Sequence, residues 1–231
     1  MKKLTFSLLL CSLLAILFFM LKEVRKDNIE LSCQGRLCEI NYRIKDFYQR
    51  FGRIPRNQHP EENKKKTSWR NELVNYDTDL RKTFFLCDRR SETELNSEVI
   101  SDFFYLQGPY TVHEFLSTRT VDLEQEMPNG RSLYQHSCFN KIFIVEDPWS
   151  TTLVSDPHDL EIDEVIELWH KREDSPNRHR SISYITFAGN YGSLDDFSTE
   201  EELRAQLVFS EEEWAELMRL DMAVVTNEES H

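Results

Sequence analysis

The sequence predicts an α+β protein in which a long N-terminal helix packs on an antiparallel sheet and short helices end the chain. Three observations lead to this fold class. From Lys2 to Phe51 there is no proline and a single glycine, so nothing interrupts a helix. Residues 83–197 hold short apolar runs separated by turn-forming residues, which is typical of a sheet. Residues 198–220 are acidic and carry two capping motifs.

The first part of the helix has the length and composition of a membrane anchor. Residues 4–21 are apolar apart from three small polar residues, and at about 1.5 Å per residue they reach about 27 Å, close to the thickness of a bilayer core. Bulky residues, Phe18 to Leu21, stand where a signal peptidase needs small ones. We therefore expect residues 1–25 to remain as a single-pass anchor in the cytoplasmic membrane, with the soluble domain outside the cytoplasm.

The second part of the helix, residues 26–51, has one apolar face and forms a stem. We expect this face to be buried against the sheet, while polar residues between its members, such as Glu39, Arg43 and Asp46, face water. The apolar residues recur at steps of three or four positions: Ile29, Cys33, Leu37, Ile40, Ile44, Phe47 and Phe51.

The rest of the chain forms one soluble domain with the stem. Gly52 and Pro55 should end the long helix, and the domain would comprise residues 26–222, with a frayed tail at 223–231. Gly189 and Asn190 form a two-residue hairpin turn. Helices are predicted at 69–80, 160–171, 198–207 and 210–220, and strands at 83–87, 99–106, 110–116, 141–146, 181–188 and 191–197.

Composition and motifs argue against several function classes. The formal net charge of −13 disfavours nucleic-acid binding, because phosphate contacts need a basic face. The chain has no G-x-S-x-G, no phosphate-binding loop and no C-x-x-C. We therefore predict a protein that is not an enzyme, with no catalytic, cofactor-binding or metal-binding residue to assign and no cofactor.

One cluster of histidine and carboxylates leaves an alternative open, an anchored enzyme or ligand-binding module with its site at 146–179. Such a site would require His158, Asp159 or Glu146 to face His179 across a cleft. The preferred interpretation is a capped helix start, with Asp159 as the N-cap. The cluster consists of Asp156, His158, Asp159, Asp163 and Glu164.

Four cysteines lie beyond the anchor, at positions 33, 38, 87 and 138. An even number fits an exported domain. Cys33 and Cys38 are five residues apart on the predicted stem, on diverging faces, and should not pair with each other. Either the stem is bridged to Cys87, to Cys138 or to both, or the thiols are free and buried.

Several short motifs, taken in order along residues 5–213, resemble a bacterial pilin-like family of unknown function. A long apolar helix that continues into an amphipathic stem is also the plan of type IV pilins and pseudopilins. The terminal hairpin, residues 179–192, resembles the prepilin-type H-x9-D-G motif, with Gly-Asn in place of Asp-Gly. The other matching segments are Ser32-Cys33 with Ile54-Pro55, Ser68-Trp69-Arg70, Leu86-Cys87-Asp88, Ile144-Val145-Glu146, Pro157-His158-Asp159-Leu160 and Thr199 to Leu207.

The resemblance implies a membrane-anchored structural or interaction protein of the cell envelope. Its partners would be the lipid bilayer, through residues 4–21, and a protein of the envelope or of secretion machinery. The N-terminus, Lys3-Leu4-Thr5-Phe6-Ser7, lacks the glycine cleavage point of a prepilin, and no acidic residue follows before Glu23. This difference argues against prepilin-type processing and against glutamate-dependent filament assembly.

Overall fold

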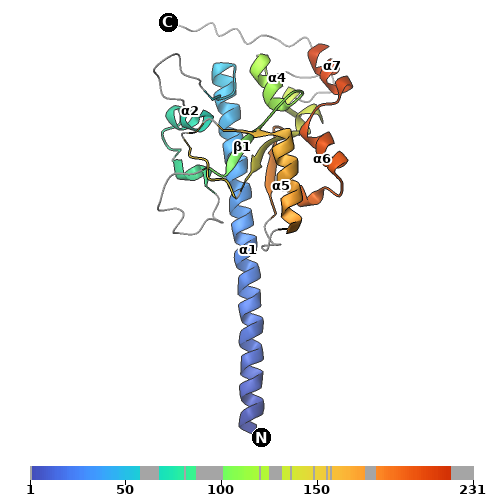
Figure 1. The fold of residues 1–231 in the computed structure, drawn as a ribbon. Coiled ribbons are helices and arrows are strands. Elements are labelled where there is room, and N and C mark those ends of the chain that lie inside the picture. Colours follow the sequence, from blue (N-terminus) through green and yellow to red (C-terminus); the bar gives the residue numbers. More distant parts are fainter. Residues whose placement is uncertain are drawn as a thin grey trace.

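The computed structural model is an α+β fold built on a mixed sheet (Figure 1). It describes residues 2–57, 68–80, 82–86, 101–119, 121–124, 132–135, 137–147, 149–154, 156, 158–174 and 181–219. The helices within these ranges are α1 (Lys2–Phe51), α2 (Trp69–Tyr76), α4 (Val112–Thr118), α5 (Ile162–Asp174), α6 (Glu200–Leu207) and α7 (Glu211–Arg219). Short 3₁₀ helices are η1 (Lys82–Phe85), η2 (Leu133–Gln135), η3 (Ser137–Asn140) and η4 (Leu194–Asp196).

The sheet has five strands within the described residues, in the order β3-β1-β2-β4-β5. The pairs β1–β2, β2–β4 and β4–β5 are antiparallel, whereas β3 pairs with β1 in parallel, so the prediction of a wholly antiparallel sheet is wrong at this edge. A strand of two residues is too short to show a pattern in the sequence. The strands are β1 (Phe103–Gln107), β2 (Ile142–Glu146), β3 (Leu160–Glu161), β4 (Ser183–Thr186) and β5 (Tyr191–Ser193).

Both faces of the sheet are covered. Along β1, Phe103 and Tyr105 belong to the core that α1 shares, whereas Phe104 and Leu106 belong to the core formed with α5 and α6. This alternation follows from the two-residue period of a strand. Because both faces are buried, β1 reads as a continuous apolar run rather than as alternating apolar and polar residues.

The C-terminal part of α1 packs on the sheet, as the stem pattern predicts. We call residues 33–51 the docked segment. Ile40 and Ile44 are fully buried and Phe47 is 2% exposed, and buried Asn41 donates hydrogen bonds of 3.3 Å to the carbonyls of Thr186 and Phe187 at the end of β4. These contacts hold the helix on the sheet and fix its register.

The polar residues expected to face water on this segment are in fact partly buried. Arg43 bonds to Glu39 at 2.7 Å and also to Asp77, which follows α2. The hydroxyl of Tyr76 donates to Asp46. The prediction is wrong here because α2 lies against this side of α1, which the helical period alone does not show.

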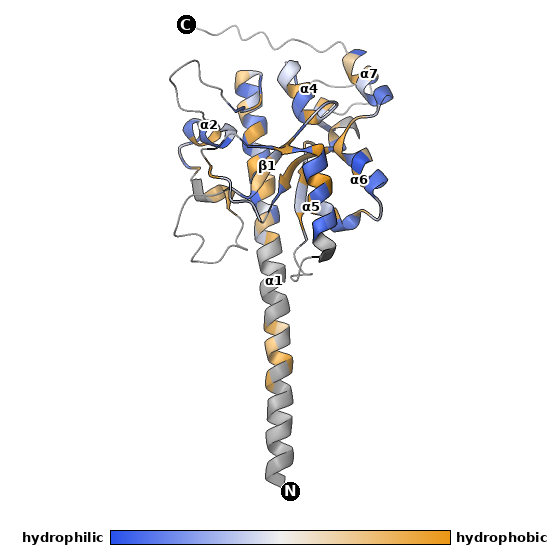
Figure 2. Cartoon of the chain, viewed as in Figure 1, coloured by the Kyte–Doolittle hydropathy of each residue, from blue (hydrophilic) through white to orange (hydrophobic). Residues whose placement is uncertain are grey.

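The N-terminal part of α1 projects away from the rest of the fold (Figure 1). We call residues 2–21 the free segment, and the sheet with its helices and the docked segment the head. The free segment's described apolar side chains are exposed (Figure 2), and they are Leu14, Ile16, Leu17, Phe18, Met20 and Leu21.

In the part of the chain that the structure describes, no helix has both the length and the apolar character needed to cross a membrane. For most of residues 4–21, the side chain is not among those that the structure describes. The anchor at residues 1–25 therefore stays a prediction, and so does the frayed tail at 223–231, which also lies outside the described residues.

Two segments predicted as strands are helical. Residues 82–85 form the 3₁₀ helix η1, where a strand was expected at 83–87. Residues 110–116 were expected to form a strand, but Thr111 caps α4 by accepting from the Glu114 amide, and the Tyr110 amide donates to the Glu114 carboxylate. These two capping bonds outweigh the β-forming residues of the segment.

Other local predictions are confirmed, some with a shift of one residue. Gly189 lies in the β4–β5 connection with a φ of 106°, which a residue with a side chain rarely adopts. The connection is longer than the predicted two-residue turn, since β4 ends at Thr186, β5 begins at Tyr191, and the Thr186 amide donates to the Asn190 carbonyl at 2.8 Å. Ser210 and Glu213 form the expected reciprocal cap at the start of α7. The cap of α6 is Thr199 with Glu202 rather than Ser198 with Glu201.

The stem carries one bonded and one free cysteine. Cys33, fully buried, is disulfide-bonded, and Cys38 is an exposed free thiol, so the two do not pair, as predicted. The cysteine that pairs with Cys33 lies outside the described side chains. Next to this bridge, the Arg36 guanidinium donates to the Leu86 carbonyl, which places the chain before Cys87 beside the stem.

Candidate functional site

The start of α2 is pinned to the middle of the head by three adjacent side chains. The Ser68 hydroxyl donates to the Val154 carbonyl, and the Trp69 ring nitrogen donates to Asp159 Oδ1 at 2.8 Å. Arg70 donates to the Phe103 carbonyl. The Ser-Trp-Arg segment therefore joins α2 to β1 and to the chain just before β3.

Arg70 is fully buried, and its guanidinium donates to two backbone carbonyls, those of Phe103 and His158. Its guanidinium also lies over the rings of Trp69, at 4.7 Å, and Phe104, at 4.6 Å. Burial lowers the pKa of Arg70 to about 10, and the nearby Asp159 carboxylate opposes this shift. Arg70 stays charged at neutral pH, so its positive charge stabilises the ionised form of the nearby Asp159 carboxylate.

Asp159 is the centre of this region, and its carboxylate receives four hydrogen bonds. Oδ1 accepts from the Trp69 ring and, at 3.3 Å, from the Tyr105 amide. Oδ2 accepts from the side-chain amides of Gln107, at 2.8 Å, and Asn57. Burial raises the pKa of Asp159 to about 6, while Arg70 and the donors act in the opposite direction.

Asp159 is not the N-cap of the following helix, contrary to the prediction. Helix α5 begins at Ile162, and its first turn is closed by the Glu164 carboxylate, which accepts from the Glu161 amide at 2.7 Å. The short strand β3 separates Asp159 from the helix. The aspartate side chain turns instead toward α2 and β1, where buried donors are available.

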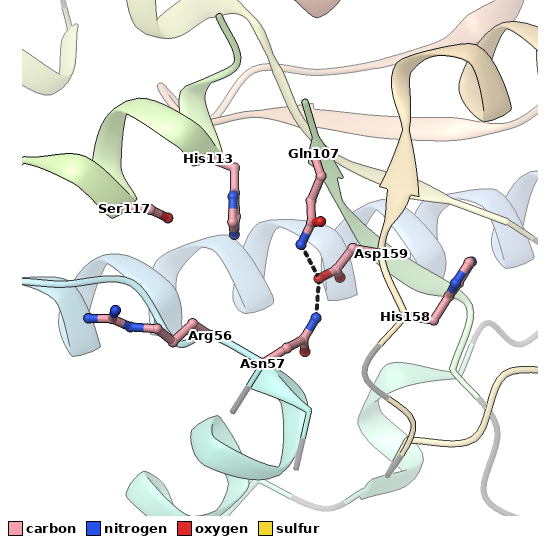
Figure 3. Close-up of a pocket in the computed structure, with 7 residues that line it drawn as sticks. All are labelled: Arg56, Asn57, Gln107, His113, Ser117, His158 and Asp159. Atoms are coloured by element: carbon pink, nitrogen blue, oxygen red, sulfur yellow. Dashed lines mark hydrogen bonds between the residues drawn. The ribbon is translucent and has the colours of Figure 1, made fainter. Parts of the chain in front are cut away.

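A cavity of about 350 Å³ opens beside Asp159 (Figure 3). Four segments that are distant in the sequence meet there: the chain after α1, the end of β1, helix α4 and the residues before β3. The residues that line it are Arg56, Asn57, Gln107, His113, Ser117, His158 and Asp159.

The two sides of this cavity differ in how well their polar groups are paired (Figure 3). On one side, Asn57 and Gln107 point toward Asp159 and bond to it. The other side carries His113 and Ser117 from α4 and Arg56, and no hydrogen bond of these three side chains is found within the described residues. Polar groups without protein partners in a cavity are available to a ligand.

His113 is a neutral imidazole in this setting. It is partly buried, with its ring 5.2 Å from the Tyr105 ring. Burial lowers its pKa to about 4, and the positive charge of Arg56 contributes in the same direction. At neutral pH the ring therefore offers one N–H donor and one acceptor.

The structure brings together only part of the predicted histidine and carboxylate cluster. His158 and Asp159 both line the cavity, but the His158 ring points away from His113 and packs on Phe104 at 5.7 Å (Figure 3). Asp156 accepts from the Leu153 amide, and Asp163 pairs with Arg204 at 3.3 Å. These two carboxylates therefore serve local structure.

The predicted opposition of Glu146, His158 or Asp159 to His179 across a cleft stays untested. Glu146 is fully buried in the sheet and accepts from the Ser183 amide, and His179 lies outside the described residues. Sequence reasoning missed Arg56, His113 and Ser117, because they are single residues in separate segments. Only the three-dimensional approach of α4 to the chain after α1 brings them together.

The geometry of this site favours binding of a ligand over proton transfer by Asp159. A carboxylate offers about four acceptor positions, and the four donors described above occupy them, so the Asp159 oxygens are engaged by the protein rather than directed at a substrate. Across the described residues, no group of three His, Cys, Asp or Glu side chains is arranged to hold a metal ion.

Comparison with known proteins adds no family to this site. No protein-family model, no curated protein and no solved structure matches the chain. The likeness to pilin-like proteins therefore rests on the sequence motifs alone and stays a prediction.

Proposed function

We propose that this chain is a membrane-anchored, pilin-like protein of the cell envelope whose head acts as a structural or interaction module rather than as an enzyme. The observation that carries the proposal is the division of one helix, α1, into a docked segment and a free segment. The free segment exposes large apolar side chains such as Leu17, 52% exposed, and Phe18, 67% exposed. A lipid bilayer is the surrounding that removes such side chains from water.

The disulfide of Cys33 supports export of the head. It lies in the buried face of the stem, and structural disulfides persist in oxidising compartments. A bridge from the stem to the rest of the head also ties the anchor to the folded domain. That connection suits a protein that passes mechanical load between a membrane and a partner.

The resemblance to the pilin-like family gains support from contacts between its motifs. Trp69 and Arg70, of the Ser-Trp-Arg segment, bond to Asp159 and to the His158 carbonyl, of the Pro-x-Asp-Leu segment. Motifs that contact each other across the fold are expected when they specify architecture. A role in catalysis would instead leave Asp159 open to a substrate.

Cys38 gives a native reporter for the test. It is the exposed free thiol of the stem, and partial burial raises its pKa, so labelling is best done at mildly alkaline pH. The full chain is expressed in bacteria, and intact spheroplasts are treated with a membrane-impermeant maleimide. The proposal predicts that the chain resists alkaline extraction from membranes and that Cys38 is labelled without lysis.

A Cys38→Ser variant is the matched control for the label. Recovery of the chain in the soluble fraction would contradict the anchor. Labelling of Cys38 only after lysis would keep the anchor but place the head in the cytoplasm, against the proposed export.

A further inference from the structure

Several polar side chains of the cavity beside Asp159 have no hydrogen-bond partner within the described part of the chain. The Arg56 side chain is exposed at the cavity, and among the described residues its guanidinium has no ion pair or hydrogen bond. The protein as a whole carries a formal charge of −13. A guanidinium at a cavity, with no partner among the residues that the structure describes, is a candidate site for an anion in so acidic a protein.

The groups around Arg56 extend this into a recognition site. His113 is neutral and can donate one N–H, and the Ser117 hydroxyl can donate a second hydrogen bond. On the other wall, Gln107 gives an amide N–H to Asp159, and its carbonyl oxygen remains as an acceptor. The cavity therefore combines one cation, two neutral donors and one acceptor.

The charge of Asp159 limits which anion fits. Asp159 lies on the same cavity as Arg56, so a group with two negative charges would be repelled while one with a single charge is balanced by Arg56. A planar carboxylate also matches the fork of a guanidinium. The volume of about 350 Å³ is at the lower end for small-molecule sites.

We propose that the cavity between α4, the end of β1 and the chain after α1 binds a carboxylate monoanion, held by Arg56, His113 and Ser117. The carboxylate belongs either to a small hydroxy acid, whose hydroxyl reaches Gln107, or to the C-terminus of a peptide. This binding site goes beyond the anchoring and structural role proposed above and does not depend on it.

The test uses the full chain in detergent micelles and nuclear magnetic resonance of the histidine rings. Sodium lactate is the first probe. We expect the His113 ring signals to shift and to saturate, with a dissociation constant on the order of 1 mM. The signals are assigned with a His113→Gln variant.

Variants separate a built site from general charge effects. Arg56→Gln should weaken lactate binding about tenfold, since it removes a charge-assisted contact, and Ser117→Ala should weaken it by a smaller factor. Arg219→Gln, at the exposed end of α7 and away from the cavity lining, should leave the affinity unchanged. Unchanged melting temperatures show that each variant is folded.

Further probes distinguish the source of the carboxylate. Trialanine with a free C-terminus is compared with the same peptide amidated. Binding of lactate alone supports a small acid, and tighter binding of free than of amidated trialanine supports a peptide end. The proposal is overturned if neither lactate nor free trialanine gives a saturable shift, if inorganic phosphate at pH 8 binds more tightly than both, or if Arg56→Gln binds as the wild type does.

Discussion

The two segments of α1 belong to one helix but have opposite surroundings. In the docked segment the apolar residues lie on one face and are buried, Ile44 fully and Phe47 to 2% exposure. In the free segment apolar residues occur around the helix, and those described are exposed, such as Leu17 and Leu21. The comparison indicates that the distribution of apolar residues, rather than their number, predicts what a helix packs against: one apolar face predicts a protein core, and an apolar circumference predicts the bilayer proposed for the free segment.

The largest expected effect is on the docked segment. Ile44→Asp should lower the free energy of unfolding of the head by about 5 kcal/mol, because it removes a buried aliphatic side chain and places a charge against the sheet. Leu17→Asp, the matched change on the free segment, should leave the melting temperature of the head within about 1 °C, since Leu17 lies outside the head and is 52% exposed. Thermal unfolding in detergent measures both, and an unchanged melting temperature for Ile44→Asp would refute the docking.

A second contrast lies between two cysteines of the same segment. Cys33→Ser should destabilise the head by about 4 kcal/mol, because it opens the disulfide that closes a long loop. Cys38→Ser should change stability by less than about 0.5 kcal/mol, since Cys38 is free and exposed. Denaturant unfolding measures both variants.

Non-reducing peptide mapping identifies the residue that pairs with Cys33. We predict Cys87, because Arg36, three residues after Cys33, bonds to the carbonyl of Leu86. A peptide that joins Cys33 to Cys138 instead would contradict this assignment but not the bridge. Finding Cys33 as a free thiol would remove the argument for an exported head.

A smaller effect comes from two titratable side chains of the cavity, Asp159 and His113, whose pKa values are shifted in opposite directions. The raised pKa of Asp159, from 3.8 to about 6, means that the folded state holds a proton which the unfolded state releases, so its contribution to stability falls as the pH rises from about 4 to 6. The lowered pKa of His113, from 6.5 to about 4, has the opposite sign, and its contribution rises between about pH 4 and 6.5. The two contributions, each about 3 kcal/mol at most, should largely cancel.

Two variants, each lacking one of these titratable side chains, separate the two contributions to stability. Asp159→Asn removes the Asp159 contribution, so the stability of this variant relative to wild type should rise between about pH 4 and 6. His113→Gln removes the His113 contribution, so its stability relative to wild type should fall between about pH 4 and 6.5. Denaturant unfolding at several pH values measures both slopes, and parallel pH profiles for the wild type and the two variants would show that neither group titrates as described.

Sequence patterns predicted the elements that are determined by residues close together in the chain. The stem stripe around Ile40 and Ile44, the strand at β2, the Gly189 turn and the cap at Ser210 all follow from helical or strand period, or from a motif within four residues. The α4 segment was missed because Tyr110 to Leu116 contains β-forming residues, while the deciding interaction is the cap between Thr111 and Glu114.

The candidate site was predicted only at Asp159 and His158. The role of Asp159 was misassigned, because a local N-cap is visible in a sequence whereas bonds to Trp69 and Gln107, far along the chain, are not. His113 and Arg56 could not be singled out at all. Each is an ordinary residue of its own segment, and only the packing of α4 beside the chain after α1 gives them a common cavity.

The most direct test of the division of α1 is to measure what surrounds each segment. Spin labels are attached to Leu17→Cys or Tyr42→Cys in a Cys11→Ser, Cys38→Ser, Cys138→Ser background, and the full chain is placed in liposomes. Tyr42 is 61% exposed on the outer face of the docked segment, which makes it the matched position. We predict that oxygen relaxes the label at 17, which is shielded from a water-soluble nickel reagent, whereas the label at 42 shows the reverse. Equal access of the nickel reagent to both labels would contradict it.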